Sequence, residues 1–369
     1  MAKDKKPIKF SLQVLLIIVS ILSIIGLVFI YSSSCIFASE KFGSSHYFLK
    51  KQIFFLMLGI VGFVTFASIP IRFFKKRAPL LFLGSFILVL LTFLPGISSK
   101  VHGSNRWLSV AGFGFQPSEL LKLFLLVYMG FLFDKKTHKV TSLARVYFPF
   151  FFVLAITFLV LLKQPDFGSV VTLFITAMIL FFVAGVKVSH LLISIGTALP
   201  FAVAAIFLKS YRLNRILVFL NPWADSKGRG YQIIQSLIAI GSGGFWGLGI
   251  SNSKQKFFYL PMQHTDFIFS IIAEEMGFFG VILIIALYGL FCYFGIKIVS
   301  KLKDSFAFFT TLGFIVLITL QSAINLMVVT GLVPTKGLGL PFISYGGSAL
   351  ICNFCMIGLI ANFVRESSD

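Results

Sequence analysis

The chain has few acidic residues, so each can be considered as a candidate for chemistry. Of its 369 residues, 12 are Asp or Glu, and Asp266 has the setting that best suits a general base. It follows Leu260-Pro261-Met262-Gln263-His264-Thr265 at the start of a long apolar stretch. Burial raises the pKa of such a carboxylate and nearby cations set its final value. The same position suits an acid that caps a helix or complements its dipole, so both roles stay open.

A second acid begins another apolar stretch. In Gln116-Pro117-Ser118-Glu119, proline suits the first helical turn and the acid complements the positive helix end. Glu119 and Lys122 are three positions apart, so their side chains can pair on one helix face. Charges at membrane depth need a partner or a wet cavity and are functional candidates by default. A structural ion pair is the alternative interpretation of Glu119 and Lys122.

The remaining acids near the predicted outer boundary are weaker candidates. Asp166 lies in Gln164-Pro165-Asp166-Phe167-Gly168, which indicates a turn followed by a helix. Glu274 and Glu275 lie about 12–14 Å deeper than Asp266 along a helix that rises 1.5 Å per residue. We expect both to face the interior of a helix bundle, where at least one can be structural.

The longest connection between apolar stretches, 209–265, carries seven Lys or Arg residues and one acid, Asp225. Long connections in compact domains are usually functional. Arg212 and Arg215 are three positions apart and could together fork onto a phosphate. The segment is therefore a candidate anion site, and a solvated loop that touches lipid headgroups is the alternative.

The composition limits which elements can position these residues. Hydrophobic residues make up 58 % of the chain and charged residues 12 %, and 47 residues are Phe. These values exclude a soluble globular domain, a disordered chain and a coiled coil. They indicate an all-α polytopic membrane protein, organised as a single integral-membrane domain over 1–369. The net charge of +20 does not indicate nucleic acid, because the cations cluster between apolar stretches as juxtamembrane charges do.

The apolar stretches predict about ten transmembrane helices. A span needs about 20 residues, and the candidate ranges are 11–33, 49–69, 79–95, 117–133, 146–162, 168–185, 188–208, 266–296, 306–331 and 342–364. Ten spans place both termini on one side of the membrane. With 209–265 set apart, the connections on the side of the termini carry 17 Lys or Arg and the opposite connections carry 7. The bias predicts cytoplasmic termini and makes 209–265 an extracytoplasmic loop.

Seven motifs occur in the order found in one known family. The chain resembles the SEDS (shape, elongation, division and sporulation) proteins of the FtsW/RodA type over about 100–365. Gly331-Leu332-Val333-Pro334-Thr335-Lys336-Gly337 looks like the FtsW division branch. The seven motifs are Gly103-Ser104-Asn105-Arg106-Trp107, Gln116-Pro117-Ser118-Glu119-Leu120-Leu121-Lys122, Gln164-Pro165-Asp166-Phe167-Gly168, Tyr211-Arg212 with Arg215, Asn221-Pro222-Trp223, His264-Thr265-Asp266-Phe267-Ile268-Phe269 and Pro341-Phe342-Ile343-Ser344-Tyr345-Gly346-Gly347-Ser348.

The resemblance implies a peptidoglycan glycosyltransferase that polymerises lipid II on the outer face of the bacterial cytoplasmic membrane during cell division. It implies that Asp266 is the essential carboxylate and that the reaction is an inverting displacement of undecaprenyl pyrophosphate. A divalent cation, Mg²⁺ or Mn²⁺, is a candidate bridge to the pyrophosphate, with no metal ligand assigned. The polar positions that match the family's substrate cavity are Arg106, Glu119, Lys122, Asp166, Arg212, Arg215, Lys256, His264, Lys336 and Ser344.

The resemblance also implies partners: lipid II, the growing glycan strand, a class B penicillin-binding protein (a transpeptidase) and other division proteins. Two departures affect regulatory contacts of the long loop rather than the base. Met262-Gln263 stands where many relatives have Glu and a small residue, and Phe258 stands where some division-type members have an acid. The alternative functions are a lipid II flippase and a non-catalytic scaffold that recruits a transpeptidase. The helix-embedded charges cluster at the outer end, which favours the enzyme over the flippase.

Overall fold

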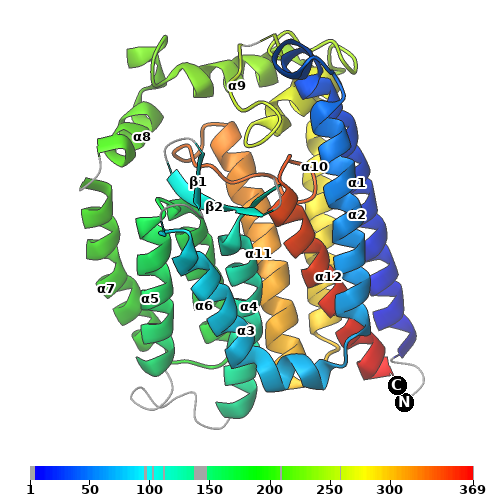
Figure 1. Cartoon of the computed structure of the whole chain (residues 1–369), viewed down its shortest axis with the longest axis vertical. Helices are drawn as coiled ribbons and strands as arrows, with labels where there is room; N and C mark the ends of the chain where they lie inside the picture. Colours follow the sequence, from blue (N-terminus) through cyan, green and yellow to red (C-terminus); the bar gives the residue numbers. More distant parts are fainter. Residues whose placement is uncertain are drawn as a thin grey trace.

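The computed structural model describes residues 5–94, 98–101, 104–110, 113–136, 148–207, 210–257 and 259–368. Within these residues the chain forms twelve α-helices, one short 3-10 helix and a small sheet (Figure 1). The α-helices are α1 (Lys5–Phe42), α2 (Tyr47–Ser68), α3 (Ile71–Leu91), α4 (Pro117–Lys136), α5 (Phe148–Lys163), α6 (Phe167–Val183), α7 (Val188–Phe207), α8 (Ser210–Leu220), α9 (Tyr231–Ser242), α10 (Ile268–Val299), α11 (Ser305–Val329) and α12 (Gly347–Ser368).

Each of the ten predicted apolar ranges coincides with one of these helices, which confirms the all-helical polytopic class. On length and composition, five of the described helices can cross a membrane: α1, α2, α10, α11 and α12. Helices α5, α6 and α7 are apolar but shorter. Helices α3 and α4 carry charged residues in their terminal turns, so the count of ten crossings stays a prediction.

The long connection 209–265 is more regular than predicted. It contains α8, the 3-10 helix η3 (Pro222–Asp225) and α9 before a turn-rich stretch that leads to α10. Helix α8 is short and amphipathic, with Arg212 and Arg215 one turn apart among apolar residues. A helix of 11 residues with charges on one face gives no long apolar run, so hydropathy alone does not reveal it.

A three-stranded antiparallel sheet is the second difference from the predicted fold. Strands β1 (Ser98–Val101), β2 (Ser104–Val110) and β3 (Phe113–Phe115) pair in sequence order between α3 and α4. Leu108 of β2 pairs with both Ser98 of β1 and Phe115 of β3. Strands this short carry too little periodic pattern for the sequence to indicate them.

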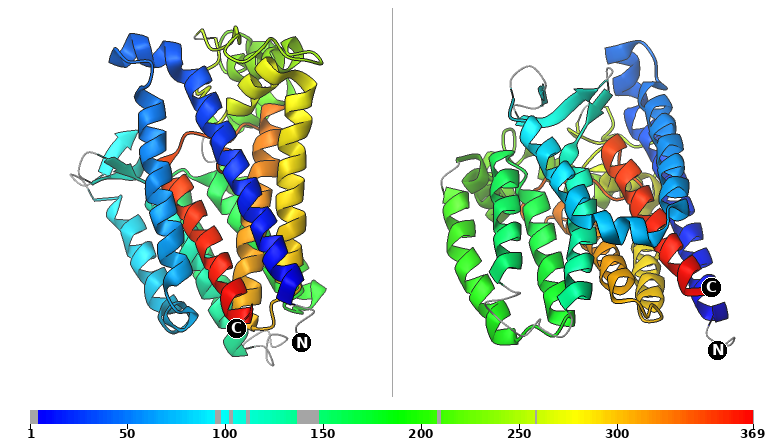
Figure 2. Two further views of the ribbon diagram at one scale, coloured as in Figure 1. Left: turned by 90° about the vertical axis from the view of Figure 1, so that its right-hand side faces the viewer. Right: turned by 60° about the horizontal axis from the view of Figure 1, so that its bottom comes forward.

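The core of the bundle surrounds α11, most of which is buried. Helix α11 contacts α4, α6 and α10, while α1 packs on α10, α2 on α12 and α3 on α4 (Figures 1 and 2). Close approach is possible because Gly26 of α1 lies against the backbone of Ile343, and Gly130 of α4 lies against Thr310 of α11. A side chain at either glycine would collide with these neighbours. The Gly130 contact is typical of helix packing through small residues, whereas Gly26 lies against the loop before α12.

Both termini lie at one end of the bundle, and the sheet, α8 and α9 lie toward the other (Figures 1 and 2). This arrangement agrees with the prediction that the two termini share a side. Which end faces the cytoplasm stays a prediction that rests on the charge bias.

Candidate active site

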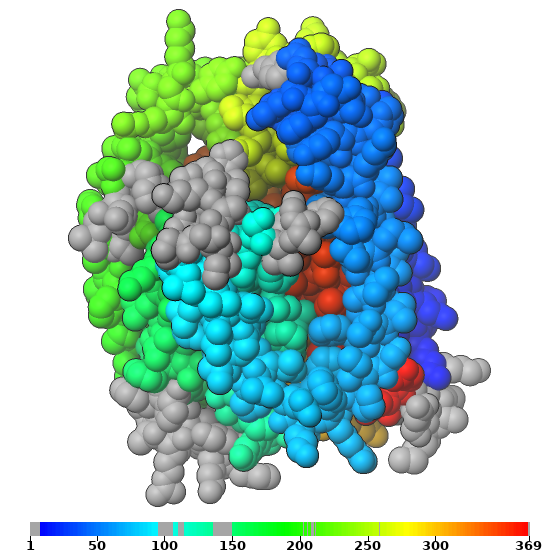
Figure 3. Space-filling model, in the orientation of Figure 1, coloured from blue at the N-terminus to red at the C-terminus, as the bar shows by residue number. Residues whose placement is uncertain are grey.

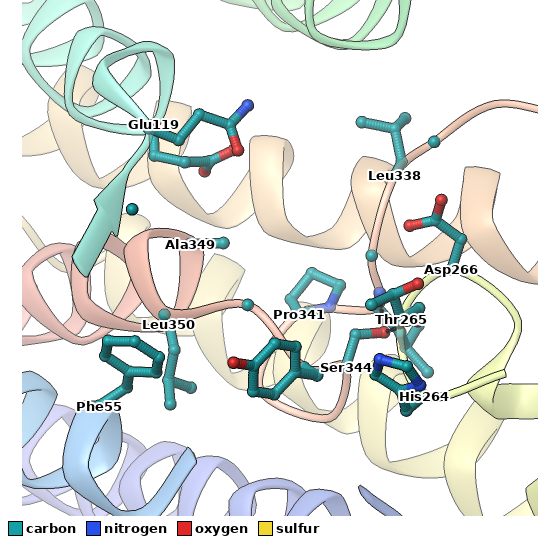
Figure 4. A pocket seen from close by; sticks show the side chains of 18 of the residues that line it. Phe55, Glu119, His264, Thr265, Asp266, Leu338, Pro341, Ser344, Ala349 and Leu350 are labelled. Atoms are coloured by element: carbon teal, nitrogen blue, oxygen red, sulfur yellow. Dashed lines mark hydrogen bonds between the residues drawn. The ribbon is translucent and has the colours of Figure 1, made fainter. Parts of the chain in front are cut away.

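A cavity of about 780 Å³ opens near the end of the bundle that carries the sheet. On the face shown in Figure 3, side chains of α12 are visible in a gap. Helix α2 lies on one side of this gap, and α3 and α4 lie on the other. The residues that line the cavity include Asp266, Glu119, Asp166, Arg106 and His264. In Figure 4, Glu119 and Asp266 lie on opposite sides of it. With Ser344, six of the predicted site residues therefore meet in one cavity, although most of them come from separate segments of the chain.

The backbone that carries Asp266 is fixed by three successive hydrogen bonds to its carbonyl groups. The carbonyl of His264 accepts from the Tyr345 backbone N–H at 3.0 Å. The carbonyl of Thr265 accepts from the Ser344 hydroxyl at 2.6 Å, and that of Asp266 accepts from the Asn325 amide at 2.9 Å. Asn325 also donates to the Leu338 carbonyl at 2.6 Å. The segment 264–266 is thereby joined to α11 and to the loop before α12.

The carboxylate of Asp266 does not cap α10. The N-cap residue of that helix is Phe267, without a side-chain capping bond, which argues against the capping role considered from the sequence. A Cβ at Gly337 would lie 3.3 Å from Asp266 Oδ2, so the loop backbone passes directly beside the carboxylate. The Asp266 side chain therefore lies at the cavity wall rather than in a helix cap.

The surroundings of Asp266 suit a base at neutral pH. Burial raises the pKa of Asp266 to about 6, while the positive charges of Arg215 and Arg106 act in the opposite direction. Burial lowers the pKa of His264 to about 4, so the neighbouring imidazole is neutral near pH 7. At that pH the Asp266 carboxylate is ionised, yet its basicity exceeds that of an ordinary Asp, which favours proton acceptance.

Glu119 and Lys122 form the ion pair that their spacing predicts. Lys122 Nζ lies 2.8 Å from Glu119 Oε1, and the two residues are 1 % and 8 % exposed. The pair lies in the first two turns of α4, where Glu119 borders the cavity. A buried ammonium without its carboxylate would be an uncompensated charge, so the pair holds this wall of the cavity together.

A second, smaller pocket of about 260 Å³ adjoins the first and shares Arg106, Asp166 and Gly337 with it. Its lining also includes Arg212, Arg215 and Lys336. Four cations from three segments that are distant in sequence therefore meet at one small pocket beside Asp266. Such a cluster is suited to bind a multiply charged anion.

Phe167 connects the cationic segments around this pocket. The Arg212 guanidinium carbon lies 5.6 Å from the centroid of its ring, and Lys336 Nζ lies 5.3 Å from the same centroid. Cation–π contacts at these distances are favourable. They hold α8 and the Pro334–Gly337 segment against the start of α6. Burial and the charge of Arg215 lower the pKa of Lys336 to about 8.

Arg106 and Asp166 fix the boundary between the two cavities. Arg106 donates from Nε to the Gln164 carbonyl and from Nη2 to the Pro165 carbonyl, both at 2.7 Å. Asp166 caps α6 by accepting from the Ser169 N–H through Oδ1 at 3.3 Å. Its Oδ2 is buried and has no hydrogen-bond partner among the described residues. The predicted turn before α6 is confirmed, and Asp166 has one oxygen left to accept a donor.

His264 and Ser344, both predicted to bind substrate, have clear structural contacts. The ring of His264 lies 4.4 Å from that of Phe48 and 5.7 Å from that of Tyr345. The Ser344 hydroxyl accepts from the Leu340 N–H at 2.7 Å in addition to its bond to Thr265. Both residues line the cavity, but the contacts of Ser344 show that it positions the backbone beside Asp266.

Lys256 lies apart from both cavities. Its ammonium donates to the Ser251 carbonyl and lies 3.7 Å from Glu275 Oε1. Glu275 also accepts from the Ser32 hydroxyl of α1 at 2.6 Å, and Glu274 accepts from the Lys254 N–H at 2.9 Å. Both glutamates are buried, as predicted, and they anchor the turn-rich stretch before α10. The structure thus gives Lys256 an ion-pair partner instead of a place at the cavity.

The two departures from the family pattern fall in the same stretch. Met262 lines the cavity with a φ of 56°, and Gln263 is buried and donates to the Lys256 carbonyl at 3.3 Å. Phe258 lies outside the described residues.

A divalent cation stays a prediction. In the part of the chain that the structure describes, no group of three or more His, Cys, Asp and Glu side chains could hold a metal ion. Asp266 and Asp166 are two separate carboxylates on the wall of one cavity. Mg²⁺ is often held by one or two carboxylates together with substrate phosphates.

Sequence reasoning missed two residues that the site depends on. Asn325 links Asp266 to the Leu338 loop, and Gly337 allows that loop to pass beside the carboxylate. The sequence held a signal for Asn325, because it is an amide within an apolar stretch. The structure shows it to be buried in α11, and buried polar groups are generally hydrogen-bonded. Its partners could not be read from the sequence, because they lie 59 and 13 positions away.

The comparisons with known proteins agree on one family. A model of the FtsW/RodA/SpoVE family, described as "Cell cycle protein", matches residues 12–369. The chain is 42 % identical over 350 residues to a "Probable peptidoglycan glycosyltransferase FtsW" of Geobacter sp. (strain M18), covering 95 % of both chains. It is 37 % identical over 360 residues to "Stage V sporulation protein E" of Bacillus subtilis (strain 168), covering 97 % of this chain and 98 % of that protein.

Solved structures share the fold over nearly the whole chain. One is described as "Structural coordination of polymerization and crosslinking by a peptidoglycan synthase complex" and matches with a TM-score of 0.77 at 29 % identity. The match covers 96 % of this chain and 97 % of that chain. The crystal structure of the rod shape determining protein RodA of Thermus thermophilus matches with a TM-score of 0.69 at 26 % identity, covering 95 % and 96 %.

Proposed function

The chain belongs to the FtsW/RodA/SpoVE family of cell cycle proteins, and on that premise we propose that it is a peptidoglycan glycosyltransferase that polymerises lipid II. The observation that carries the proposal is the position of the Asp266 carboxylate. It makes no capping bond to α10, and it lies at the wall of a large cavity beside a pocket lined by four cations. The names of its FtsW relatives support the same activity.

In the proposed mechanism Asp266 is the general base. Its carboxylate takes the proton from the 4-hydroxyl of the acceptor sugar, and that oxygen attacks the anomeric carbon of the donor. The bond from that carbon to the pyrophosphate breaks, and undecaprenyl pyrophosphate leaves with the electron pair. Because the leaving group is already anionic, it needs little acid assistance, and a single displacement inverts the anomeric centre.

The cations of the smaller pocket would bind the pyrophosphate. Arginine forks suit phosphate oxygens because the guanidinium presents several donors in one plane. Arg212 and Arg215 lie on α8, whereas Lys336 lies on the loop that passes Asp266, so a pyrophosphate held there would lie next to the base. A divalent cation, Mg²⁺ or Mn²⁺, is proposed to accompany it.

The setting proposed for this reaction is the outer face of the bacterial cytoplasmic membrane at the division site, with both termini in the cytoplasm. The charge bias of the connections supports this orientation. A class B penicillin-binding protein is the proposed partner. The similarity to a peptidoglycan synthase complex that combines polymerization with crosslinking supports such a partnership.

Purified protein supplied with radiolabelled lipid II tests the proposal directly. The expected result is glycan polymer on a gel, either from the protein alone or after addition of its transpeptidase partner. Absence of polymer under both conditions would contradict the proposed function.

Replacing Arg212 or Arg215 with Ala is expected to weaken binding of the lipid pyrophosphate by about 10- to 100-fold, because a hydrogen bond to a charged group is lost. Lysine at either position should restore part of the affinity, since it keeps the charge but cannot fork. The measurement is the affinity for undecaprenyl pyrophosphate in detergent micelles. Arg229→Ala is the matched control, because Arg229 pairs with Asn214 at 2.7 Å and lies outside both pockets. Equal affinity for all variants would contradict the prediction.

The pH profile of polymerisation is expected to be bell-shaped. Below the Asp266 pKa of about 6 the base becomes protonated, and the rate should fall about tenfold per pH unit. Above the Lys336 pKa of about 8 the ammonium loses its charge and the anion pocket weakens. A rate that stays constant from below to above pH 6 would contradict the assignment of Asp266.

Two variants test the assignment of the acidic limb to Asp266 and of the alkaline limb to Lys336. Lys336→Arg keeps its charge at high pH, so the alkaline limb should disappear. Arg215 lowers the pKa values of both Asp266 and Lys336, so Arg215→Ala should move both limbs to higher pH. Arg212→Ala is the control, because Arg212 is not among the charges that shift either pKa.

A further inference from the structure

An aromatic and basic cluster lies at the rim of the large cavity, around the turn from α1 to α2. The rings of Phe42 and Tyr47 are stacked with centroids 4.0 Å apart and an interplanar angle of 7°. Lys51 donates to the Tyr47 hydroxyl at 2.7 Å, and its ammonium lies 4.4 Å from the centroid of that ring. All three residues line the cavity.

This rim cluster is connected to the candidate base. The ring of Phe48 lies 5.7 Å from that of Phe42 and 5.2 Å from that of Tyr47. On its other side, Phe48 lies 4.4 Å from the ring of His264, two positions before Asp266. The rim cluster is thus linked to the segment that carries Asp266 through the rings of Phe48 and His264.

The chemistry of the cluster suits a sugar. A flat aromatic face binds the apolar C–H face of a pyranose ring, while neighbouring polar groups bind its hydroxyl or carboxylate groups. Phe42 is 42 % exposed, its ring stacks on Tyr47, and Lys41 Nζ lies 5.9 Å from its centroid. Lysine has three donors, and Lys51 uses one of them on Tyr47, so further donors remain for a saccharide hydroxyl or a peptide carboxylate.

We propose that Phe42, Tyr47 and Lys51 form a saccharide subsite that holds a sugar of the glycan strand away from the bond being made at Asp266. The proposal rests on the proposed function, because the occupant is the strand that the reaction extends. Such a subsite keeps the strand bound between successive additions. Its loss should shorten the polymer more than it slows formation of each bond.

The competing interpretation is an aromatic anchor at the membrane surface, where Tyr and Trp are common. The chain offers a matched control for that role. Trp246 is 78 % exposed and stacks on Phe279 with centroids 4.9 Å apart, but neither residue lines a described cavity. An anchor role would give Phe42→Ala and Trp246→Ala similar effects on polymer length. A saccharide subsite would give an effect for the rim variants and none for Trp246→Ala.

The test uses the full-length protein in two assays. The first compares the chain-length distribution of polymer made from lipid II by wild type, Phe42→Ala, Tyr47→Ala and Trp246→Ala. The second measures binding of peptide-free, lipid-free glycan oligomers of defined length by calorimetry, without turnover. Phe42→Tyr and Tyr47→Phe keep the rings and serve as conservative variants.

The expected result is shorter polymer and about 3- to 10-fold weaker oligomer binding for the two rim alanine variants. Trp246→Ala and the two ring-conserving variants should resemble wild type. Unchanged chain length and binding in the rim variants, or equal shortening by Trp246→Ala, would overturn the subsite. If wild-type protein makes no polymer either alone or with its transpeptidase partner, the proposed function fails, while oligomer binding still decides whether the rim recognises saccharide.

Discussion

Replacing Asp266 with Asn is expected to reduce lipid II polymerisation by about 10²- to 10⁴-fold, the usual contribution of a positioned general base. Asn has nearly the same shape as Asp but cannot accept the proton. The backbone bonds that hold 264–266 are made by carbonyl groups and are unaffected by the change. Polymer on a gel and thermal stability, measured in the same detergent preparation, check the prediction.

The Asn variant should keep its fold and its partner, which would make it dominant-negative in cells. A capping role would give the opposite pattern, with Asn tolerated and Ala mildly destabilising. The absence of a side-chain cap at the start of α10 argues against that role. Near-normal polymer from Asp266→Asn would contradict the assignment of the base and would favour the lipid II flippase as the function.

Breaking the Glu119–Lys122 pair is expected to have the second largest effect. Removing one partner of a buried ion pair costs about 3–5 kcal/mol, because the other charge stays buried without compensation. Glu119→Ala and Lys122→Ala should therefore each lower both thermal stability and polymerisation. The double variant Glu119→Lys with Lys122→Glu should recover part of the loss, and a double-mutant cycle measures the coupling.

The matched control for this pair lies at the other end of α4. Lys75 Nζ lies 2.9 Å from Asp134 Oδ2, but the two side chains are 36 % and 23 % exposed. Asp134→Ala should therefore cost at most about 1 kcal/mol. Normal activity and stability in either single variant of the buried pair would show that the pair is incidental.

The large elements could be predicted because their signals are local. A long apolar helix shows as a continuous apolar stretch, so ten ranges read from hydropathy coincide with ten helices. The Glu119–Lys122 contact could be predicted in the same way, because two side chains three positions apart on a helix lie close together. The short elements were not: the sheet and α8 carry too few residues for a clear periodic pattern.

The candidate site was predictable as a set of residue types but not as a geometry. The sequence indicated Arg212, Arg215 and Lys336 as polar positions, yet their shared pocket exists because α8 and the Pro334–Gly337 loop both pack against Phe167. Lys256 is a residue that the sequence placed at the site and the structure does not. It belongs to the same basic segment as Arg212, but its ion pair with Glu275 removes it from the cavity.

By itself, the sequence determined the membrane class, the ten long apolar helices and the presence of a carboxylate at the start of α10, because hydropathy and helical spacing act between neighbours in the chain. The tertiary structure alone decided what surrounds that carboxylate. Asn325 and Gly337 reach Asp266 across 59 and 71 positions, and such contacts depend on how α10, α11 and the loop before α12 pack. That packing sets the burial that raises the pKa of Asp266 to about 6, and it places the charges of Arg215 and Arg106 that act in the opposite direction.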